Sequence, residues 1–223
     1  TGTYNIAIGY QAADALVGNS NYNIAIGKNA LGGTNLTCQH AIAIGTNSLA
    51  SSTYAAAAIN LAIGMDSGKA ISSGTANVLI GHEAGLTLST HAENTAVGFN
   101  ALKGSAGSYN TAVGKDALLG GLTGGSNTAV GVSAMYTAAA DMSDNVAIGV
   151  SALYHLNHAN ADSNVAIGRS AGKQTTAGTP AAVDEASQSV FIGAATESAA
   201  DNAANEIVIG YGGQGQGTNT IQL

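Results

Sequence analysis

A pentapeptide of the form Asn-x-Ala-(Ile/Val)-Gly recurs about twelve times along this chain of 223 residues. Consecutive final glycines lie 16 residues apart at the shortest step, from Gly98 to Gly114, and 25 apart at the longest, from Gly168 to Gly193. Self-similarity at such a period is typical of repeat proteins, in which each repeat is one structural unit stacked on the next. The final glycines are Gly9, Gly27, Gly45, Gly64, Gly81, Gly98, Gly114, Gly131, Gly149, Gly168, Gly193 and Gly210.

The residues before each glycine predict a short strand. In the repeat at 94–98, the β-branched Thr95 and Val97 alternate with the small Ala96. This period of two favours a strand over a helix. Stacking of equivalent slots would give aliphatic columns one strand spacing apart, about 4.8 Å. We therefore expect an all-β parallel solenoid of about twelve short coils, with residues 1–223 as a single repeat domain and a segment of a longer fibre.

The slot between the two β-branched residues is alanine in nine of the twelve repeats, with Leu79, Phe191 and Val208 as the exceptions. Both faces of the predicted strand are therefore apolar, whereas a strand with one wet face alternates apolar with polar residues. One face can fill the interior of the coil. The small alanines suit close approach by another chain, so we expect oligomerisation through the alanine face.

The glycine ends the strand, through a positive φ or a close backbone approach. A small residue and then often leucine follow, as in Ala101-Leu102, which predicts a second, shorter strand or a bend. The rest of each period is rich in Gly, Ser, Thr and Asn, which is typical of turns. Variable repeat length is absorbed there, with the longest loop insertion at 173–188 and a C-terminal partial coil at 211–223.

Asparagines that begin the pentapeptides form a second predicted column, broken by Ala41, Ser189 and Glu206. Stacked asparagine side chains can hydrogen-bond one another along the stack and satisfy backbone groups of the turns. The functional alternative is a row of ligand-binding amides. The column consists of Asn5, Asn23, Asn60, Asn77, Asn94, Asn110, Asn127, Asn145 and Asn164.

The sequence Asn-Thr-Ala-Val-Gly at 94–98, 110–114 and 127–131, with the Ala-Leu pairs at 101–102 and 117–118, resembles the repeats of phage tail fibres and tail spikes. It is also similar to the YadA-like head repeat of bacterial trimeric autotransporter adhesins. The resemblance implies a left-handed parallel β-roll, with three identical chains packed side by side as a homotrimeric rod. Adhesin head repeats tend to be shorter, so the longer period here favours the phage type. The run from Asn205 to Ile221 is similar to the run preceding a self-cleaving chaperone domain in phage fibres.

The expected function is that of a non-enzymatic structural or adhesion protein, extracellular and on the virion surface, as a viral tail fibre or spike that displays loops for host attachment. The alternatives are the head of a bacterial trimeric adhesin on the cell surface and a subunit of a self-assembling extracellular filament. Repeat proteins often bind through variable insertions on one face. A host receptor or glycan would therefore contact the irregular segments 50–58, 136–144, 154–163 and 173–188, with Tyr154, His155, His158, Asp184 and Glu185 as candidate binding residues.

Composition argues against other classes of function. The six basic residues are spread along the chain, whereas nucleic-acid binding needs clustered Lys and Arg. The longest apolar stretch, 55–63, is interrupted by Asn60 and is too short to cross a bilayer, so no membrane insertion by this segment is expected. A Walker motif is absent, and the Gly-rich segments follow repeat turns. We expect no enzymatic activity and no cofactor.

Two side-chain pairs have the residue types found in metal sites or in glycosidase active sites. A three-fold axis would multiply His155 and His158 into a metal site, but a solvent-exposed loop is the favoured interpretation, so no metal is expected. Asp184 and Glu185 form a carboxylate pair, yet glycosidases need two carboxylates across a sugar cleft. Sequence neighbours on a polar loop rarely have that arrangement.

Overall fold

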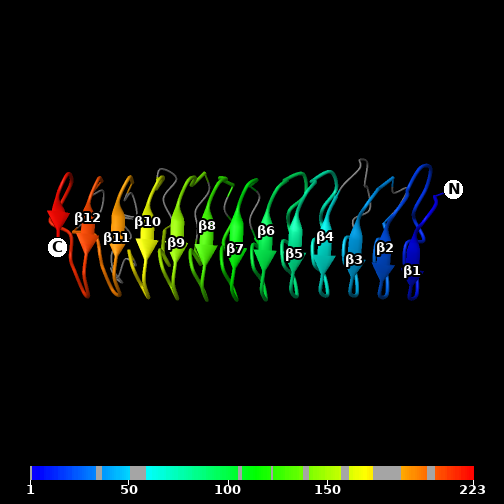
Figure 1. Cartoon of the computed structure of the whole chain (residues 1–223), viewed down its shortest axis with the longest axis horizontal. Helices are drawn as coiled ribbons and strands as arrows, with labels where there is room; N and C mark the ends of the chain where they lie inside the picture. The colour runs from blue at the N-terminus through cyan, green and yellow to red at the C-terminus, as the bar shows by residue number, and fades with distance from the viewer. Residues whose placement is uncertain are drawn as a thin grey trace. The chain divides into compact units, whose positions relative to one another are not determined.

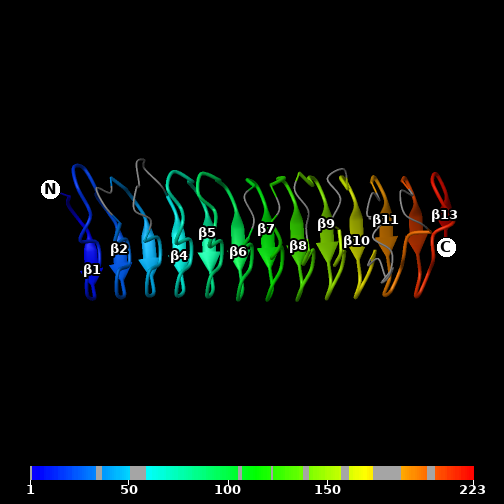
Figure 2. The same cartoon turned by 180° about the vertical axis from the view of Figure 1, so that it is seen from behind.

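The computed structural model describes residues 2–33, 37–50, 59–104, 107–121, 123–137, 141–156, 161–172, 187–199 and 204–223. These residues form a parallel β-solenoid, and no helix is assigned among them. The described part of the chain accordingly offers no helix with the length and hydrophobicity needed to span a membrane. The chain divides into two compact units, Thr1–Tyr109 and Asn110–Leu223. Within each unit, successive strands stand side by side and point the same way (Figures 1 and 2).

Strands of the first unit pair in parallel, each with the next strand along the chain. Equivalent residues of successive pentapeptides lie opposite each other, as Ala43 does to Ala62. The strands are β1 (Ile6–Ile8), β2 (Ile24–Ile26), β3 (Ile42–Ile44), β4 (Leu61–Ile63), β5 (Val78–Ile80) and β6 (Thr95–Val97).

The second unit repeats this pattern. Its strands are β7 (Thr111–Val113), β8 (Thr128–Val130), β9 (Val146–Ile148), β10 (Val165–Ile167), β11 (Val190–Ile192), β12 (Ile207–Ile209) and β13 (Ile221–Gln222). Ala166 pairs with Phe191 although the longest connection separates them, so the insertion does not shift the register. The last strand, β13, lies in the predicted C-terminal partial coil and pairs with β12.

The three residues of a strand lie in two different environments. From β2 to β12 the middle residue is buried, and Ala43 and Ala112 have no exposed surface. The first and third residues are partly exposed, and Ile148 is 40% exposed. In β1 all three residues are exposed. The prediction that the alanines face a neighbouring chain is therefore wrong, because they face the interior of their own coil.

The inward strand residue has to be small because large side chains on the opposite wall of each coil already fill the interior. Residues four after the glycine supply it: Leu31, Leu49, Leu102, Leu118, Met135 and Leu153 are at most 1% exposed. Glycine replaces this residue at Gly68, Gly85 and Gly172. Large strand residues of the same coil or the next one lie against these glycines: a Cβ atom added to Gly85 would lie 2.6 Å from Leu79 of the same coil, and one added to Gly172 would lie 2.9 Å from Phe191 of the next coil. Large and small residues exchange walls, so the interior stays filled.

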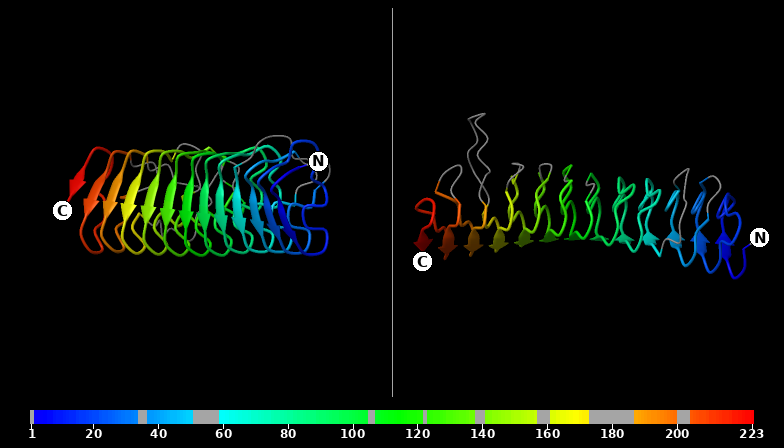
Figure 3. Two further views of the ribbon diagram at one scale, coloured as in Figure 1. Left: turned by 45° about the vertical axis from the view of Figure 1, so that its right-hand side comes forward. Right: turned by 90° about the horizontal axis from the view of Figure 1, so that it is seen from above.

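The segment after each glycine is a turn, and no second strand is assigned to these positions among the described residues. Asn100 and Leu102 both have φ of 56°, in the left-handed region. This conformation costs a non-glycine residue roughly 1–2 kcal/mol. Hydrogen bonds between coils offset the cost, as from Asn100 N to His82 O at 3.0 Å. The strands line one side of the coils, and the described parts of the connections between them lie on the other side (Figure 3).

The repeated glycine has both properties predicted for it, a positive φ and a close approach of its backbone to the next coil. Gly27 has φ of +129°, which L side chains rarely adopt. A Cβ atom there would also lie 2.7 Å from the carbonyl oxygen of Gly45 in the next coil. Successive coils thus touch backbone to backbone at this point, and any side chain would separate them.

Candidate functional site

The outward residues of each unit form a band that we call the outer stripe. It consists of the first and third residues of each strand and the residue that follows each glycine. In the second unit its third-position isoleucines are 38–40% exposed, and Val132 and Val150, which follow glycines, are 46% and 47% exposed. In the first unit Met65 and Phe99 are 47% and 48% exposed. The third-position isoleucines are Ile148, Ile167, Ile192 and Ile209.

Chemically, the outer stripe is largely apolar at its strand positions, whereas the residues that follow the glycines are mixed and include Lys28, Lys115 and Arg169. No other part of the single chain covers its exposed isoleucines and valines. The strands of a parallel sheet are normally covered on both faces. Contiguous exposed apolar patches on a soluble protein mark surfaces that contact another molecule. The in-register pairing makes the strand positions of the stripe periodic, because an aliphatic residue or threonine recurs there at every strand spacing. The stripe is therefore suited to a partner with the same repeat.

The asparagine column is buried and internally hydrogen-bonded. Asn127 donates from its backbone N to Asn110 Oδ1 at 3.0 Å and from Nδ2 to the same oxygen at 3.1 Å. Its Nδ2 also donates to the carbonyl oxygen of Met142 at 2.9 Å. In the first unit, Asn94 makes the same two bonds to Asn77 Oδ1. From Asn23 to Asn164 the column asparagines are at most 1% exposed, so this part of the column is not accessible to a ligand, and the alternative of ligand-binding amides is disfavoured there.

Where the column changes residue, hydrogen bonding continues. Ser189 donates its backbone N to Asn164 Oδ1 at 3.1 Å, and Glu206 donates its backbone N to Ser189 Oγ at 3.1 Å. The Glu206 carboxylate is fully buried and accepts from Ser198 Oγ at 2.6 Å and from Gly217 N at 2.8 Å. This carboxylate joins two connections to the end of the column and is a structural group.

Of the candidate binding residues, the structure brings Tyr154 and His155 together. Tyr154 stacks on Tyr136 with ring centroids 5.0 Å apart, and the His155 ring lies edge-on to Tyr154 at 4.5 Å. His155 Nδ1 is 3.2 Å from Thr137 Oγ1. The other three candidates lie outside the described residues, as do 51–58, 138–140, 157–160 and 173–186 of the candidate loops. These three are His158, Asp184 and Glu185.

An exposed aromatic column was missed in the sequence. Tyr4 stacks on Tyr22 with centroids 5.1 Å apart, and Tyr22 stacks on His40 at 5.0 Å. Tyr4 and Tyr22 are 74% and 52% exposed. Tyr4 and Tyr22 immediately precede asparagines of the column, and His40 precedes Ala41, which fills the same slot, so aligning the repeats on that slot would have revealed the stack.

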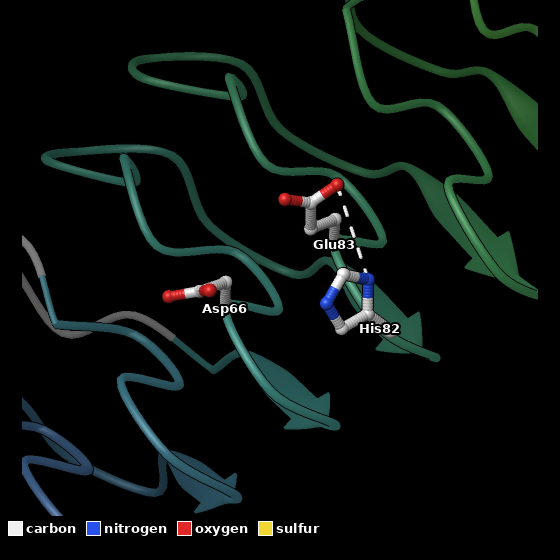
Figure 4. A group of neighbouring side chains, drawn as sticks. All are labelled: Asp66, His82 and Glu83. Atoms are coloured by element: carbon white, nitrogen blue, oxygen red, sulfur yellow. Dashed lines mark ion pairs between the residues drawn. The ribbon is translucent and has the colours of Figure 1, made fainter.

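A cluster of titratable side chains lies in two successive turns of the first unit (Figure 4). Asp66 follows β4, and His82 and Glu83 follow β5; each offers a ligand atom, and these atoms lie within 4.8 Å of one another. Burial alone would raise the pKa of Asp66, but hydrogen bonds from Asn47 and Lys69, with the charges of Lys69 and His82, lower it below its usual value. Asp66 is therefore ionised at neutral pH. None of the sequence patterns described above predicted this cluster.

Comparison with protein-family models gave no match for the chain, and comparison with curated proteins gave none. Roles of individual residues therefore cannot be transferred from a relative. The chemistry of the outer stripe and of the cluster has to be inferred from their own geometry.

Proposed function

We propose that this chain is a structural segment of an extracellular homotrimeric fibre, of the viral tail fibre or spike type, that displays loops for attachment to a host surface. The observation that carries the proposal is the outer stripe, an apolar and periodic surface that a single chain leaves uncovered. The repeat resemblance adds the number of chains and the left-handed winding. The proposed role is mechanical and adhesive, without enzymatic activity.

Self-association is favoured because the outer stripe of one chain matches the outer stripe of a second copy in spacing and side-chain type. A second copy presents β-branched side chains at the same spacing of about 4.8 Å, so the columns of two chains can interdigitate along their length. Burial of apolar surface contributes roughly 25 cal/mol per Å². Obligate interfaces between identical subunits have this apolar character and resemble a divided core. Three copies around one axis would cover each stripe from two sides.

The connections support the adhesive part of the proposal. Their described parts lie on the side of the coils opposite the strands (Figure 3), so stripe-to-stripe packing leaves that side accessible. Tyr154 and exposed His155 stand at the start of one such connection. The head of a bacterial trimeric adhesin, or an extracellular filament, would use the same stripe, and the gene context of the full-length protein separates these from a viral fibre.

Sedimentation equilibrium of the purified chain tests the proposal. We expect the mass of three chains for the natural sequence and of one chain for the double variant Ile148→Glu/Ile167→Glu. The variant should retain the circular-dichroism spectrum of a β protein, because both changed side chains point outward. The matched control is Thr90→Glu, which adds a carboxylate at an exposed position off the stripe and should remain trimeric.

Two outcomes would contradict the proposal. A natural chain that sediments as a monomer at high concentration would rule out the stripe as an interface between copies. A trimer that survives both isoleucine substitutions would place the contact on another surface.

A further inference from the structure

We infer that Asp66, His82 and Glu83 form a binding site for a divalent transition-metal ion such as Zn²⁺. The three side chains come from successive coils of the first unit, so their proximity depends on the stacking of the turns. Their ligand atoms lie within 4.8 Å of one another, and no other group of three His, Cys, Asp or Glu residues in the described part of the chain is arranged in this way. The site needs no second chain, although His82 follows Gly81 and so belongs to the outer stripe.

The imidazole of His82 lies beside the Glu83 carboxylate in one turn, and Asp66 lies in the neighbouring turn (Figure 4). Its Nδ1 lies 3.9 Å from Glu83 Oε2, too far for a hydrogen bond. This nitrogen is inaccessible to solvent and has no hydrogen-bond partner in the described structure. A buried polar atom without a partner is unfavourable by about 1–3 kcal/mol. A metal ion bound to this nitrogen would satisfy it.

Neighbouring side chains hold the ligands in place. The Phe99 ring stacks on His82 with centroids 5.0 Å apart and an interplanar angle of 9°, which restricts rotation of the imidazole. Asp66 Oδ1 accepts from Asn47 Nδ2 at 3.0 Å and pairs with Lys69 Nζ at 3.1 Å. Partners of this kind orient metal ligands and influence affinity.

One oxygen of each carboxylate is left for an ion. The hydrogen bond from Asn47 and the ion pair with Lys69 both involve Asp66 Oδ1, and Glu83 uses Oε2 to pair with Lys103 Nζ at 2.6 Å. Asp66 Oδ2 and Glu83 Oε1 have no partner among the described residues. The Lys69 and Lys103 side chains are 48% and 36% exposed, so their ammonium groups can move into solvent when a doubly charged ion binds.

The ligand set selects the class of metal. One imidazole nitrogen and two carboxylate oxygens suit Zn²⁺ and its first-row neighbours, whereas Mg²⁺ and Ca²⁺ prefer oxygen ligands alone. Zinc bonds of about 2.0–2.2 Å in tetrahedral geometry place the ligand atoms roughly 3.4 Å apart, so ligand atoms that now lie as much as 4.8 Å apart have to approach by about 1.4 Å. Rotation of the long Glu83 side chain supplies this. Three protein ligands leave a fourth position for water or an external group.

Equilibrium dialysis of the chelator-treated chain against ZnCl₂, followed by elemental analysis, tests the site. We expect about one zinc per chain for the natural sequence, and at least tenfold weaker binding for His82→Gln and for Asp66→Asn. Two matched controls should bind as the natural chain does. Asp116→Asn removes a carboxylate from the same turn position beside Lys115, and His91→Gln removes a second histidine with a buried, unpartnered Nδ1.

Substitution with Co²⁺ gives an independent measurement. Binding should produce visible absorption bands that His82→Gln abolishes, while circular dichroism of the metal-free variant shows that the coil remains folded. Absence of stoichiometric zinc in the natural chain would overturn the inference. Undiminished binding by both His82→Gln and Asp66→Asn, or loss of binding in His91→Gln, would overturn it as well by placing the metal elsewhere.

Discussion

The inward and outward residues of one strand differ in size and in exposure. In β9, Ala147 is fully buried while the larger Ile148 beside it is 40% exposed. The usual half-buried strand has its bulky residues inside. Here the inward residue faces a wall that already carries leucine, so little space remains for it. The outward residue can be as large as its partner surface allows. Residue size, more than hydrophobicity, therefore distinguishes the two faces.

The largest expected difference between the inward and outward faces of a strand comes from placing a charge on each face in turn. Ala112→Glu should prevent folding of the chain, because the carboxylate would be buried without a partner at a cost of several kcal/mol. Thr111→Glu, one residue away and facing outward, should leave the coils folded. Circular dichroism and thermal melting of both variants measure the difference. If Ala112→Glu melted like Thr111→Glu, the inward assignment of the alanines would be wrong.

A smaller effect is expected from exchanging bulk between the two walls. Leu79→Ala should lower the free energy of unfolding by about 2–5 kcal/mol, since it leaves a cavity where glycine faces the strand. Gly85→Leu alone should cost about 1–3 kcal/mol by overpacking against Leu79. The double variant restores the alanine-with-leucine arrangement of other coils, and leucine is accepted in the left-handed conformation at Leu102.

Urea denaturation of the two single variants and the double variant measures the coupling. We expect the double variant to be more stable than the sum of the single effects predicts, by at least about 1 kcal/mol. Additive effects would show that the two walls do not compensate each other.

The pKa of the buried Cys38 thiol measures how well water is excluded from the interior, in contrast with the exposed outward face. Burial raises the pKa of its thiol from 9.0 to about 11. Because the folded pKa lies above the unfolded one, this contribution to stability is complete below pH 9 and is lost as the pH rises through 11. Over that window the natural chain should lose about 2–3 kcal/mol more than Cys38→Ala.

Denaturation of both proteins at a series of pH values from 8 to 11 gives this difference. A thiol reagent at pH 8 should label unfolded chains quickly and folded chains slowly, because the thiolate is the reactive form. Parallel pH profiles for the two proteins would mean that the Cys38 site is hydrated.

Local patterns were sufficient to predict the strands and the turns. Alternation of Thr95, Ala96 and Val97 and the conformational freedom of glycine are properties of neighbouring residues. Local patterns could not predict which face of the strand the alanines occupy, because both faces are apolar. The distance to the opposite wall, which decides it, is a tertiary property. The compensation between Leu79 and Gly85 is tertiary too.

Stacking explains why the metal-ligating cluster was missed. His82 and Asp66 are far apart along the chain and meet because the coils stack in register. Counting from the glycines would have identified the pair: Asp66 is two residues after Gly64, and His82 and Glu83 are one and two residues after Gly81. The exact separation of the ligand atoms depends on side-chain rotamers, which no sequence count provides.

Backbone contact between successive glycines has a consequence for length. Since Gly27 rests directly on Gly45, the rise from one coil to the next is set by peptide geometry and not by the side chains of that repeat. Connections of different length therefore change the outline of a coil without changing its thickness. Within a unit, each additional pentapeptide lengthens the stack by about 4.8 Å. The number of glycines acts as a ruler for the distance that the segment spans.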